Sequence, residues 1–426
     1  MENTTNTTIE QPRDRAVLVG LNSPKLDQRD NADEDTLEEL SDLVETAGGE
    51  VVATVLQTRF SPEPRTFIGE GKVEEVRELV KNEEATMVIF DNDLSPSQQR
   101  SLTEDLKVQV LDRSALILDI FAQRARTREG RLQVELAQYQ YLLPRLTGMW
   151  THLERQAGTS GKGPIGSKGP GETQLETDRR HIHRKIDKLK AELEEVRRVR
   201  GTQRQRRMKN EIPVVAIVGY TNAGKSTLLN RLTGAGILAE DKLFATLDPT
   251  TRNLEMPDGQ KLLLTDTVGF IRKLPHHLIE AFKSTLEEAK YSDIILHVVD
   301  ASNPQMDMHM HVVYDTLRQL EVKDKVMITV YNKLDRIAEP VRLKDMSADY
   351  QVRISAKNGD GLDTLMDTLS QVLRSQRVYL EKTYGYHEAG KIQRIRRSGQ
   401  LLSEEYAEDG IRVKAYVPAA LYAEFR

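Results

Sequence analysis

The stretch Gly219–Ser226, GYTNAGKS, has the residue types and the spacing of a phosphate-binding loop. Its glycines let backbone N–H groups curl around phosphate oxygens, and a β-branched run before it and a helical pattern after it supply the strand–loop–helix context. Lys225 would place a positive charge on the β- and γ-phosphates, and Ser226 would offer a hydroxyl ligand to Mg²⁺. The predicted loop residues are Gly219, Tyr220, Thr221, Asn222, Ala223, Gly224, Lys225 and Ser226.

Three further motifs follow this loop, and together they indicate guanine specificity. In Asp266-Thr267-Val268-Gly269 the aspartate can hold the magnesium shell and Gly269 can donate an N–H to a γ-phosphate. In Asn332-Lys333-Leu334-Asp335 the last carboxylate can accept hydrogen bonds from guanine N1–H and its exocyclic amine. Adenine would leave that carboxylate unpaired at a cost of about a few kcal/mol. Backbone contact to the guanine carbonyl is expected from Ser355, Ala356 and Lys357, so the set predicts a GTPase.

The segment LFATLDPTTR between the first two motifs offers a second hydroxyl for magnesium. Thr246, Thr250 and Thr251 are all candidates, and their spacing does not choose among them.

The residue after DTVG is Phe270, where many GTPases have a glutamine that orients the attacking water. We therefore expect slow intrinsic hydrolysis, with water positioned by another group. The Asn222 carbonyl could hold a K⁺ ion beside the phosphates, or the residue could only stabilise the turn of the loop, and the sequence leaves both roles open.

Alternating apolar runs and amphipathic stretches around these motifs predict an α/β protein. We expect a tail at 1–14, a small parallel α/β domain at 15–113 with Ser95 capping a helix that begins at Pro96, and a G domain at 211–375. Within the G domain an Asp258–Gly259 turn predicts a β-hairpin. A small α/β domain at 376–426 completes the chain.

The region 114–210 has apolar residues at steps of three and four on both sides of a glycine-rich loop at 158–171, GKGPIGSKGPG at its centre. This pattern predicts an antiparallel helical hairpin with that loop at its tip. The loop carries Lys162 and Lys168, and the second helix ends in a run of positive charge. Hypothetical RNA contacts are therefore Lys162, Lys168, Arg197, Arg198, Arg200, Arg204, Arg206 and Arg207.

The amino-acid composition limits the classes of protein to which this chain can belong. The formal net charge of −5 does not by itself indicate a nucleic-acid binder, and the absence of cysteine excludes disulfides and thiolate metal sites. No apolar stretch approaches the roughly 20 residues of a membrane span, and no signal peptide pattern is present. We expect a cytoplasmic protein without stable membrane insertion, and a monomer.

Several motifs together resemble the HflX family of ribosome-associated GTPases: GYTNAGKS, LFATLDPTTR, DTVGF and NKLD, with RTREGRLQVELAQ and GPGETQLETDRR upstream. The resemblance implies Mg²⁺-dependent GTP hydrolysis, binding to the large ribosomal subunit and its RNA, and dissociation of stalled or idle ribosomes under stress. It also implies that Thr246 is the magnesium threonine and that Phe244, Ala245, Thr246, Leu247 and Asp248 surround the nucleotide. The catalytic candidates are then Lys225, Thr246, Gly269 and Asn222, with Ser226 and Thr246 as metal ligands.

Two other function classes remain open from the sequence. One is a nucleotide-driven RNA-remodelling enzyme with a second, ATP site in the α/β domain. The other is a signalling switch whose helical rod binds a protein.

Overall fold

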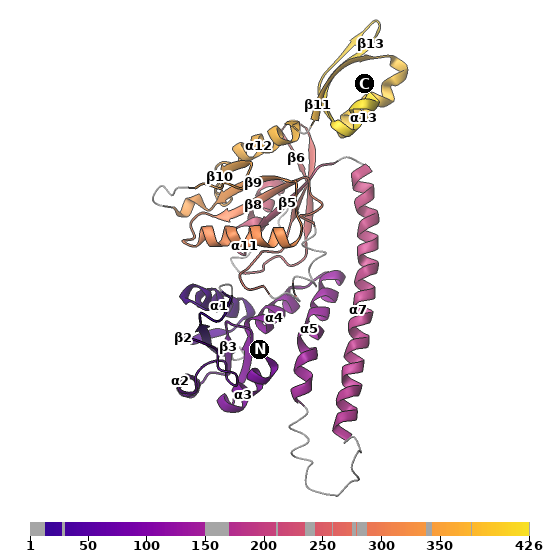
Figure 1. The fold of residues 1–426 in the computed structure, drawn as a ribbon. Helices are drawn as coiled ribbons and strands as arrows, with labels where there is room; N and C mark the ends of the chain where they lie inside the picture. Colours follow the sequence, from indigo (N-terminus) through magenta and orange to yellow (C-terminus); the bar gives the residue numbers. More distant parts are fainter. Residues whose placement is uncertain are drawn as a thin grey trace, which may run out of the picture. The chain divides into compact units, whose positions relative to one another are not determined.

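In this computed structural model the described residues are 13–27, 30–149, 170–209, 212–234, 243–257, 259–274, 278, 288–337, 343–375 and 377–425 (Figure 1). The predicted tip loop 158–171 lies almost wholly outside them. The chain divides into two compact units. The first comprises Met1–Ala125, Arg131–Lys190 and Arg272–Ile279, and the second comprises Arg126–Gly130, Ala191–Ile271 and Glu280–Arg426.

The first unit contains the expected parallel α/β domain. Its strands β1 (Arg15–Asn22), β2 (Glu50–Thr58), β3 (Met87–Phe90) and β4 (Gln109–Asp112) pair in the order β2-β1-β3-β4, all parallel. Helices α2 (Glu70–Asn82) and α3 (Pro96–Leu106) contact each other, as do α1 (Glu34–Ala47) and α4 (Arg113–Arg124). The predicted start of α3 is confirmed, because the Ser95 side chain accepts from the Gln98 N–H and Pro96 is the first helical residue.

Helix α4 belongs with this sheet, although the predicted domain boundary at 113/114 assigned it to the hairpin. Its residues Ile117, Leu118, Ile120 and Phe121 are buried, and its Asp112 N-cap lies at the end of β4. A helix that is apolar on most of its surface needs covering on several sides, so it packs as part of a domain core.

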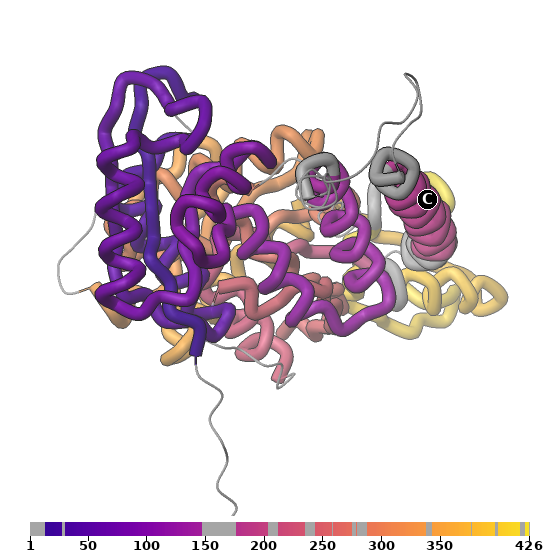
Figure 2. Tube along the Cα trace, turned by 90° about the horizontal axis from the view of Figure 1, so that it is seen from below, coloured from indigo at the N-terminus to yellow at the C-terminus, as the bar shows by residue number. Residues whose placement is uncertain are grey.

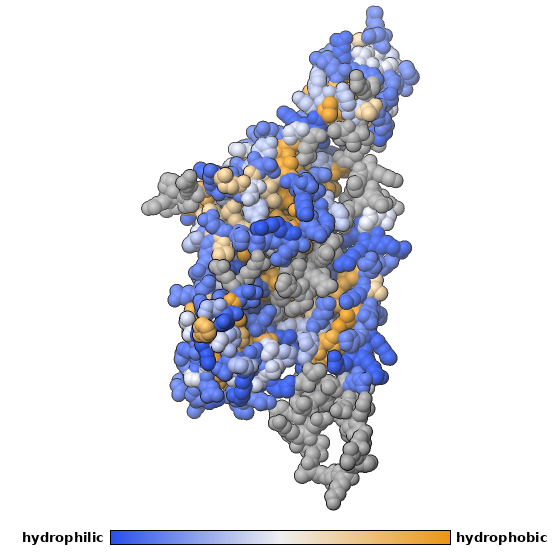
Figure 3. All heavy atoms as spheres, in the orientation of Figure 1, coloured by the Kyte–Doolittle hydropathy of each residue, from blue (hydrophilic) through white to orange (hydrophobic). Residues whose placement is uncertain are grey.

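The hairpin helices α5 (Arg128–Met149) and α7 (Pro170–Lys209) run antiparallel, and α5 continues past Pro144 (Figures 1 and 2). Within the first unit they lie side by side, and Lys185 Nζ on α7 donates to the Tyr139 hydroxyl on α5 over 2.7 Å. The apolar seam is buried as predicted at Leu132, Leu136, Ile182, Ile186 and Leu189. Figure 3 shows apolar side chains toward α5 and hydrophilic ones along the opposite side of α7.

The second unit contains a sheet with strand order β10-β9-β8-β5-β7-β6. The strands are β5 (Val214–Gly219), β6 (Thr250–Glu255), β7 (Lys261–Asp266), β8 (Ile294–Asp300), β9 (Val326–Asn332) and β10 (Tyr350–Arg353). All pairs are parallel except β6 with β7, which form the predicted hairpin. Helices α8 (Lys225–Thr233), α11 (Met306–Gln319) and α12 (Leu362–Ser375) alternate with the strands. Short 3₁₀ turns lie at Leu334–Arg336 and Tyr386–Glu388.

The C-terminal residues form a smaller antiparallel sheet with a core of its own. Strands β11 (Arg377–Tyr384), β12 (Gln400–Ala407) and β13 (Gly410–Pro418) pair in the order β11-β13-β12, with helices α13 (Ala389–Ser398) and α14 (Ala419–Phe425). This agrees with the predicted small α/β domain.

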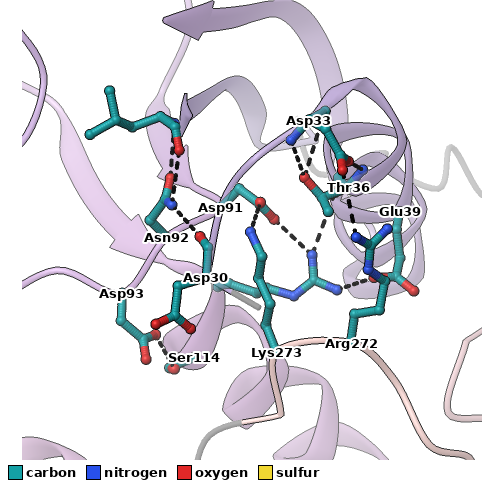
Figure 4. Close-up of polar contacts among 12 residues, drawn as sticks. Asp30, Asp33, Thr36, Glu39, Asp91, Asn92, Asp93, Ser114, Arg272 and Lys273 are labelled. Carbon is teal, nitrogen blue, oxygen red and sulfur yellow. Dashed lines mark hydrogen bonds and ion pairs between the residues drawn. The ribbon is translucent and has the colours of Figure 1, made fainter. Parts of the chain in front are cut away.

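A segment that directly follows the DTVGF motif belongs to the first unit. Lys273 Nζ forms an ion pair with the Asp91 carboxylate at the end of β3, and Arg113 forms a second pair with Asp91 at 2.8 Å (Figure 4). Arg272 lies 3.6 Å from Asp33, the N-cap of α1. All three members of the Lys273–Asp91–Arg113 cluster are buried. Burial would raise the pKa of Asp91, but the two cations outweigh that effect and hold the pKa below its ordinary value.

Candidate nucleotide site

The motif residues meet at one edge of the second unit's large sheet because each follows the carboxyl end of a parallel strand. The P-loop follows β5, DTVG ends β7, NKLD ends β9, and Ser355–Lys357 follow β10. They surround a pocket of about 400 Å³ whose lining residues are Thr221, Asn222, Gly224, Lys225, Ser226, Thr227, Phe244, Ala245, Thr246, Gly269, Asn332, Lys333, Asp335, Arg336, Ala356 and Lys357.

Two glycines of the P-loop are required by its shape. Gly219 has φ of 155°, and a Cβ there would overlap the carbonyl oxygen of Val298 on β8. Gly224, with φ of 92°, is the N-cap of α8, and a Cβ would overlap the Asn332 amide. The loop therefore passes close to the sheet and leads directly into the start of α8, an arrangement typical of phosphate-binding loops.

The residues predicted to hold magnesium lie together. Ser226 Oγ and Thr246 Oγ1 are 2.8 Å apart, and Ser226 Oγ donates to Asp266 Oδ2 over 2.7 Å. The second oxygen, Asp266 Oδ1, is buried without a hydrogen-bond partner among the described residues, and burial raises the pKa of this carboxyl. Two hydroxyls beside a buried carboxylate fit the oxygen ligand set that Mg²⁺ prefers. Thr250 and Thr251 instead begin β6, and Thr251 Oγ1 is 3.0 Å from Thr265 Oγ1.

Lys225 brings a buried positive charge to the same place. Its Nζ donates to the Tyr220 carbonyl over 2.6 Å and only 6% of the residue is exposed. Burial lowers the pKa of Lys225 to about 8. A phosphate in the pocket would supply the counter-charge that favours the ammonium form.

The predicted base-recognition residues form the other end of the pocket. Asp335 Oδ1 accepts from the Ser355 hydroxyl over 2.6 Å, and this hydrogen bond lowers the pKa of Asp335. Asn332 joins two loops, since its Nδ2 donates to Ala223 O and its Oδ1 accepts from Ala356 N, each over 2.9 Å. The carboxylate is thus ionised and oriented, as recognition of two guanine donors requires.

Phe270 does not reach the pocket. Its ring is buried, while its backbone exchanges hydrogen bonds with the P-loop: its carbonyl accepts from Thr221 N over 2.7 Å and its N–H donates to Gly219 O over 3.1 Å. Gly269 is therefore the residue of DTVGF that lines the pocket.

Several of the predicted nucleotide-binding residues do not line the pocket themselves. Tyr220, Ala223, Leu247, Val268 and Ser355 are buried next to lining residues. Asp248 does not line the pocket: its carboxylate accepts from the N–H groups of Arg126 and Thr127 over 3.0 and 2.9 Å and from the Thr127 hydroxyl. Leu334 begins the 3₁₀ turn after Lys333.

Thr227 and Arg336 line the pocket although the motifs did not include them; each directly follows a motif residue.

Three of the arginines predicted to contact RNA, Arg197, Arg198 and Arg200, have acidic partners. Arg197 pairs with Glu194 and Arg198 with Glu195, one turn away on the exposed helix surface. Arg200 pairs with Glu129 at 2.8 Å and with Glu288 at 3.5 Å. The side chains of Lys162, Lys168, Arg204, Arg206 and Arg207 lie outside the described residues.

Comparisons with known proteins match most of the chain. Residues 34–122 match the model of the GTP-binding GTPase N-terminal region, 124–207 match that of the GTP-binding GTPase middle region, and 214–333 match that of the 50S ribosome-binding GTPase. A GTPase HflX from Lacrimispora saccharolytica is 60% identical over 415 residues, which cover 97% of this chain and 96% of that protein.

This chain belongs to the HflX family of GTPases. The GTPase HflX of Escherichia coli K12 is 45% identical over 347 residues, 81% of this chain and 80% of the relative. Among solved structures, a GTP-binding protein from Sulfolobus solfataricus in complex with GDP is 26% identical, covers 84% of this chain and 98% of its own, and has a TM-score of 0.44. Membership of the HflX family confirms the resemblance that the motifs indicated, and the protein is a GTP hydrolase.

No helix in the described parts of this HflX protein is both long enough and apolar enough to cross a bilayer.

Proposed function

We propose that the protein binds the large ribosomal subunit and uses GTP binding and hydrolysis to dissociate stalled or idle ribosomes under stress, acting as a cytoplasmic monomer. The observation that carries this proposal is the match of residues 214–333 to the 50S ribosome-binding GTPase model, in a chain whose nucleotide pocket is assembled from all four motifs.

Nucleotide and metal binding are assigned to the residues of the pocket. Ser226 and Thr246 hold Mg²⁺ through their hydroxyls, with Asp266 behind them. The ion supplies positive charge to the β- and γ-phosphates. Lys225 binds the same phosphates, the Gly269 N–H donates to the γ-phosphate, and Asp335 accepts from guanine.

Water activation is assigned to a group other than residue 270. Because the Phe270 ring is buried, this position offers no hydrogen bond to water. K⁺ held by the Asn222 carbonyl would add charge at the phosphates in place of an arginine finger. Asn222 lines the pocket, which supports this role, and its φ of 58° supports the competing role in shaping the turn. Contact with the ribosome would complete the site, so we expect the large subunit to stimulate hydrolysis.

Contact with ribosomal RNA is assigned to the tip loop 158–171 and the basic end of α7. Arg197 and Arg198 each have an exposed intrahelical partner, and such pairs contribute at most about 1 kcal/mol, so a phosphate can replace them. Arg200 differs because its two acidic partners leave its side chain 25% exposed. We therefore expect Arg197 and Arg198 to contribute more to RNA binding than Arg200.

Light scattering of intact ribosomes mixed with the protein in GTP, GDP and a non-hydrolysable analogue tests the proposal. Dissociation should require the triphosphate form. Replacing residues 158–171 by an uncharged flexible loop of equal length should abolish most dissociation but leave GTP affinity intact. A second replacement that retains two lysines should restore part of it. Full activity of the uncharged loop would show that the tip is a passive connector.

Sedimentation with large subunits at increasing salt tests the RNA contacts. Replacing both Arg197 and Arg198 by glutamine should weaken binding and reduce its salt dependence. Arg180→Gln is the matched control, since Arg180 is also exposed on α7 and paired with Glu176 one turn away. Salt-independent binding would favour a protein partner, and a nucleotide stoichiometry above one would favour the RNA-remodelling alternative.

A further inference from the structure

Asp248 connects the segment that carries Thr246 to the residues directly before helix α5. It lies two residues after Thr246, yet its carboxylate accepts hydrogen bonds from the Arg126 and Thr127 N–H groups and from the Thr127 hydroxyl. All of these residues belong to the second unit. The contact joins positions more than 120 residues apart in the sequence.

The start of α5 is shaped to receive this carboxylate. N–H groups before and in the first turn of a helix have no intrahelical acceptor, and the helix dipole favours negative charge there. The Thr127 hydroxyl is oriented because it donates to Asp248 while accepting from the Gly130 N–H over 3.0 Å. At Gly130 a Cβ would overlap Asp248 Oδ1, so glycine leaves the space that the carboxylate occupies.

Thr246 is held between fixed points on the chain. Phe244 and Leu247 on either side of it are buried, and β6 begins at Thr250 directly after Pro249. Proline restricts both its own φ and the conformation of the residue before it, which is Asp248. The segment that carries Thr246 is therefore anchored at Asp248 and at the strand.

We propose that Asp248 is a positioning residue for GTP hydrolysis. By binding Arg126 and Thr127 directly before α5, it holds the Thr246 hydroxyl 2.8 Å from that of Ser226, where both can serve one magnesium ion. The carboxylate does not line the nucleotide pocket. It acts through Thr246, and the RTREG sequence before and in α5 is its receptor.

The Asp248→Ala variant tests the proposal because GTP hydrolysis should be impaired while GDP affinity is retained. Intrinsic kcat should fall by about tenfold to a hundredfold, and the Mg²⁺ concentration for half-maximal rate should rise, because Thr246 is no longer held. GDP affinity should stay within about twofold, since the phosphate loop and the base contacts are intact. Asp248→Asn retains an acceptor oxygen and should recover part of the rate. A wild-type rate and Mg²⁺ dependence in Asp248→Ala, or an equal loss of GDP and GTP-analogue affinity, would overturn the proposal.

The Gly130→Ala variant distinguishes an effect on the position of Thr246 from an effect on protein stability. Alanine has a higher helix propensity than glycine, which offsets part of the lost Asp248 contact, and the melting temperature of the variant checks that it is folded. The variant should nevertheless show the kinetic defect of Asp248→Ala, because its methyl group displaces the carboxylate. Glu135→Ala, at an exposed position on α5, is the control for helix composition and should hydrolyse GTP normally. A normal rate in Gly130→Ala would count against the proposal.

A reversible crosslink provides an independent test, because the chain has no cysteine to interfere. A Cβ built on Gly130 lies 3.4 Å from Asp248 Cγ, so Gly130→Cys combined with Asp248→Cys places two thiols within bonding reach. The oxidised double variant should recover Mg²⁺ dependence and rate toward wild type, and reduction should lower the rate to that of Asp248→Ala. Equal rates before and after reduction of a fully formed crosslink would contradict the proposal.

Discussion

The side-chain hydroxyls of Ser226 and Thr246 lie 2.8 Å apart, one in the first turn of α8 and the other in the segment before β6. Their positions differ in what anchors them. Ser226 belongs to a helix and also donates to Asp266, whereas Thr246 lies in an irregular segment. The two ligands should therefore respond differently to mutation.

Thr246→Ala should lower the rate of GTP hydrolysis by about tenfold to a hundredfold while GDP binding changes little, because the threonine hydroxyl acts together with the γ-phosphate. Ser226→Ala should weaken Mg²⁺-dependent binding of both nucleotides. Single-turnover hydrolysis and fluorescent-GDP titration measure the two effects, with Thr246→Ser as the control that retains the hydroxyl. Equal loss of GDP affinity in both variants would refute this division of roles.

Asp335→Asn should weaken GTP binding and favour xanthosine triphosphate, since the 2-oxo group of xanthine replaces an amine with an acceptor. The loss of one charge-assisted pair corresponds to about 1.5–3 kcal/mol, or roughly tenfold to a hundredfold in Kd. Competition binding with both triphosphates measures the change. Asp360→Asn, at an exposed aspartate that is not among the pocket-lining residues, should bind GTP normally. Undiminished GTP preference in Asp335→Asn would reject the specificity argument.

Asn222→Gly separates the two roles of this residue. Its φ of 58° is readily adopted by glycine, so the turn should be preserved while the side-chain carbonyl is lost. If the carbonyl holds K⁺, hydrolysis in potassium should fall to the rate observed in sodium. Asn222→Ala should in addition weaken GDP binding, because alanine disfavours the left-handed conformation. Potassium stimulation that persists in Asn222→Gly would leave the residue only its role in the turn.

His297, buried on β8 in an edge-to-face contact with Tyr314, should make the second unit sensitive to acid. Burial lowers its pKa from 6.5 to about 4. Between those values the unfolded chain binds a proton that the folded chain does not, so the free energy of unfolding falls as pH decreases. The loss reaches about 3 kcal/mol below pH 4 and is absent above pH 6.5. Melting temperatures of His297→Gln should depend less on pH across this window. His311→Gln, at an exposed position on α11, should keep the wild-type slope.

Asp91→Asn should destabilise the α/β domain by about 3–5 kcal/mol, because it leaves the buried cations Lys273 and Arg113 without their shared carboxylate. Lys273→Met should cost less, since Asp91 keeps Arg113 and the methionine is apolar. Hydrogen exchange at the amides of β1 and β3 measures both changes. A larger loss of protection in Lys273→Met than in Asp91→Asn would contradict the assignment of Asp91 as the centre of the cluster.

Local signals in the sequence predicted the features that depend on neighbouring residues. Ser95 and Pro96 located a helix start, the spacing of GYTNAGKS located a phosphate loop between strand and helix, and the steps of Leu132 and Leu136 located the hairpin seam. These features follow from backbone geometry and periodicity, which a short window contains.

Features that depend on distant residues were not predictable in this way. The family resemblance implies that Asp248 lies near the nucleotide, but its carboxylate binds N–H groups more than 120 positions earlier. The bounds predicted from the sequence place most of α4 in the hairpin, and an apolar helix has the same residue pattern in either setting. In both cases the neighbouring residues in the sequence are compatible with more than one packing partner, and the tertiary structure determines which partner is used.

The ion pair of Asp91 and Lys273 spans 182 positions, and this separation has a consequence for biosynthesis. The ribosome delivers the sheet, Asp91 and Arg113 long before Lys273 leaves the exit tunnel, and domains generally fold from the N-terminus during translation. The nascent α/β domain must first balance the buried aspartate with Arg113 alone. Its final stability is reached only when Lys273 has been translated, directly after the DTVGF motif. The last ion pair of the α/β domain therefore forms only after the P-loop and DTVGF motifs of the nucleotide pocket have been synthesised.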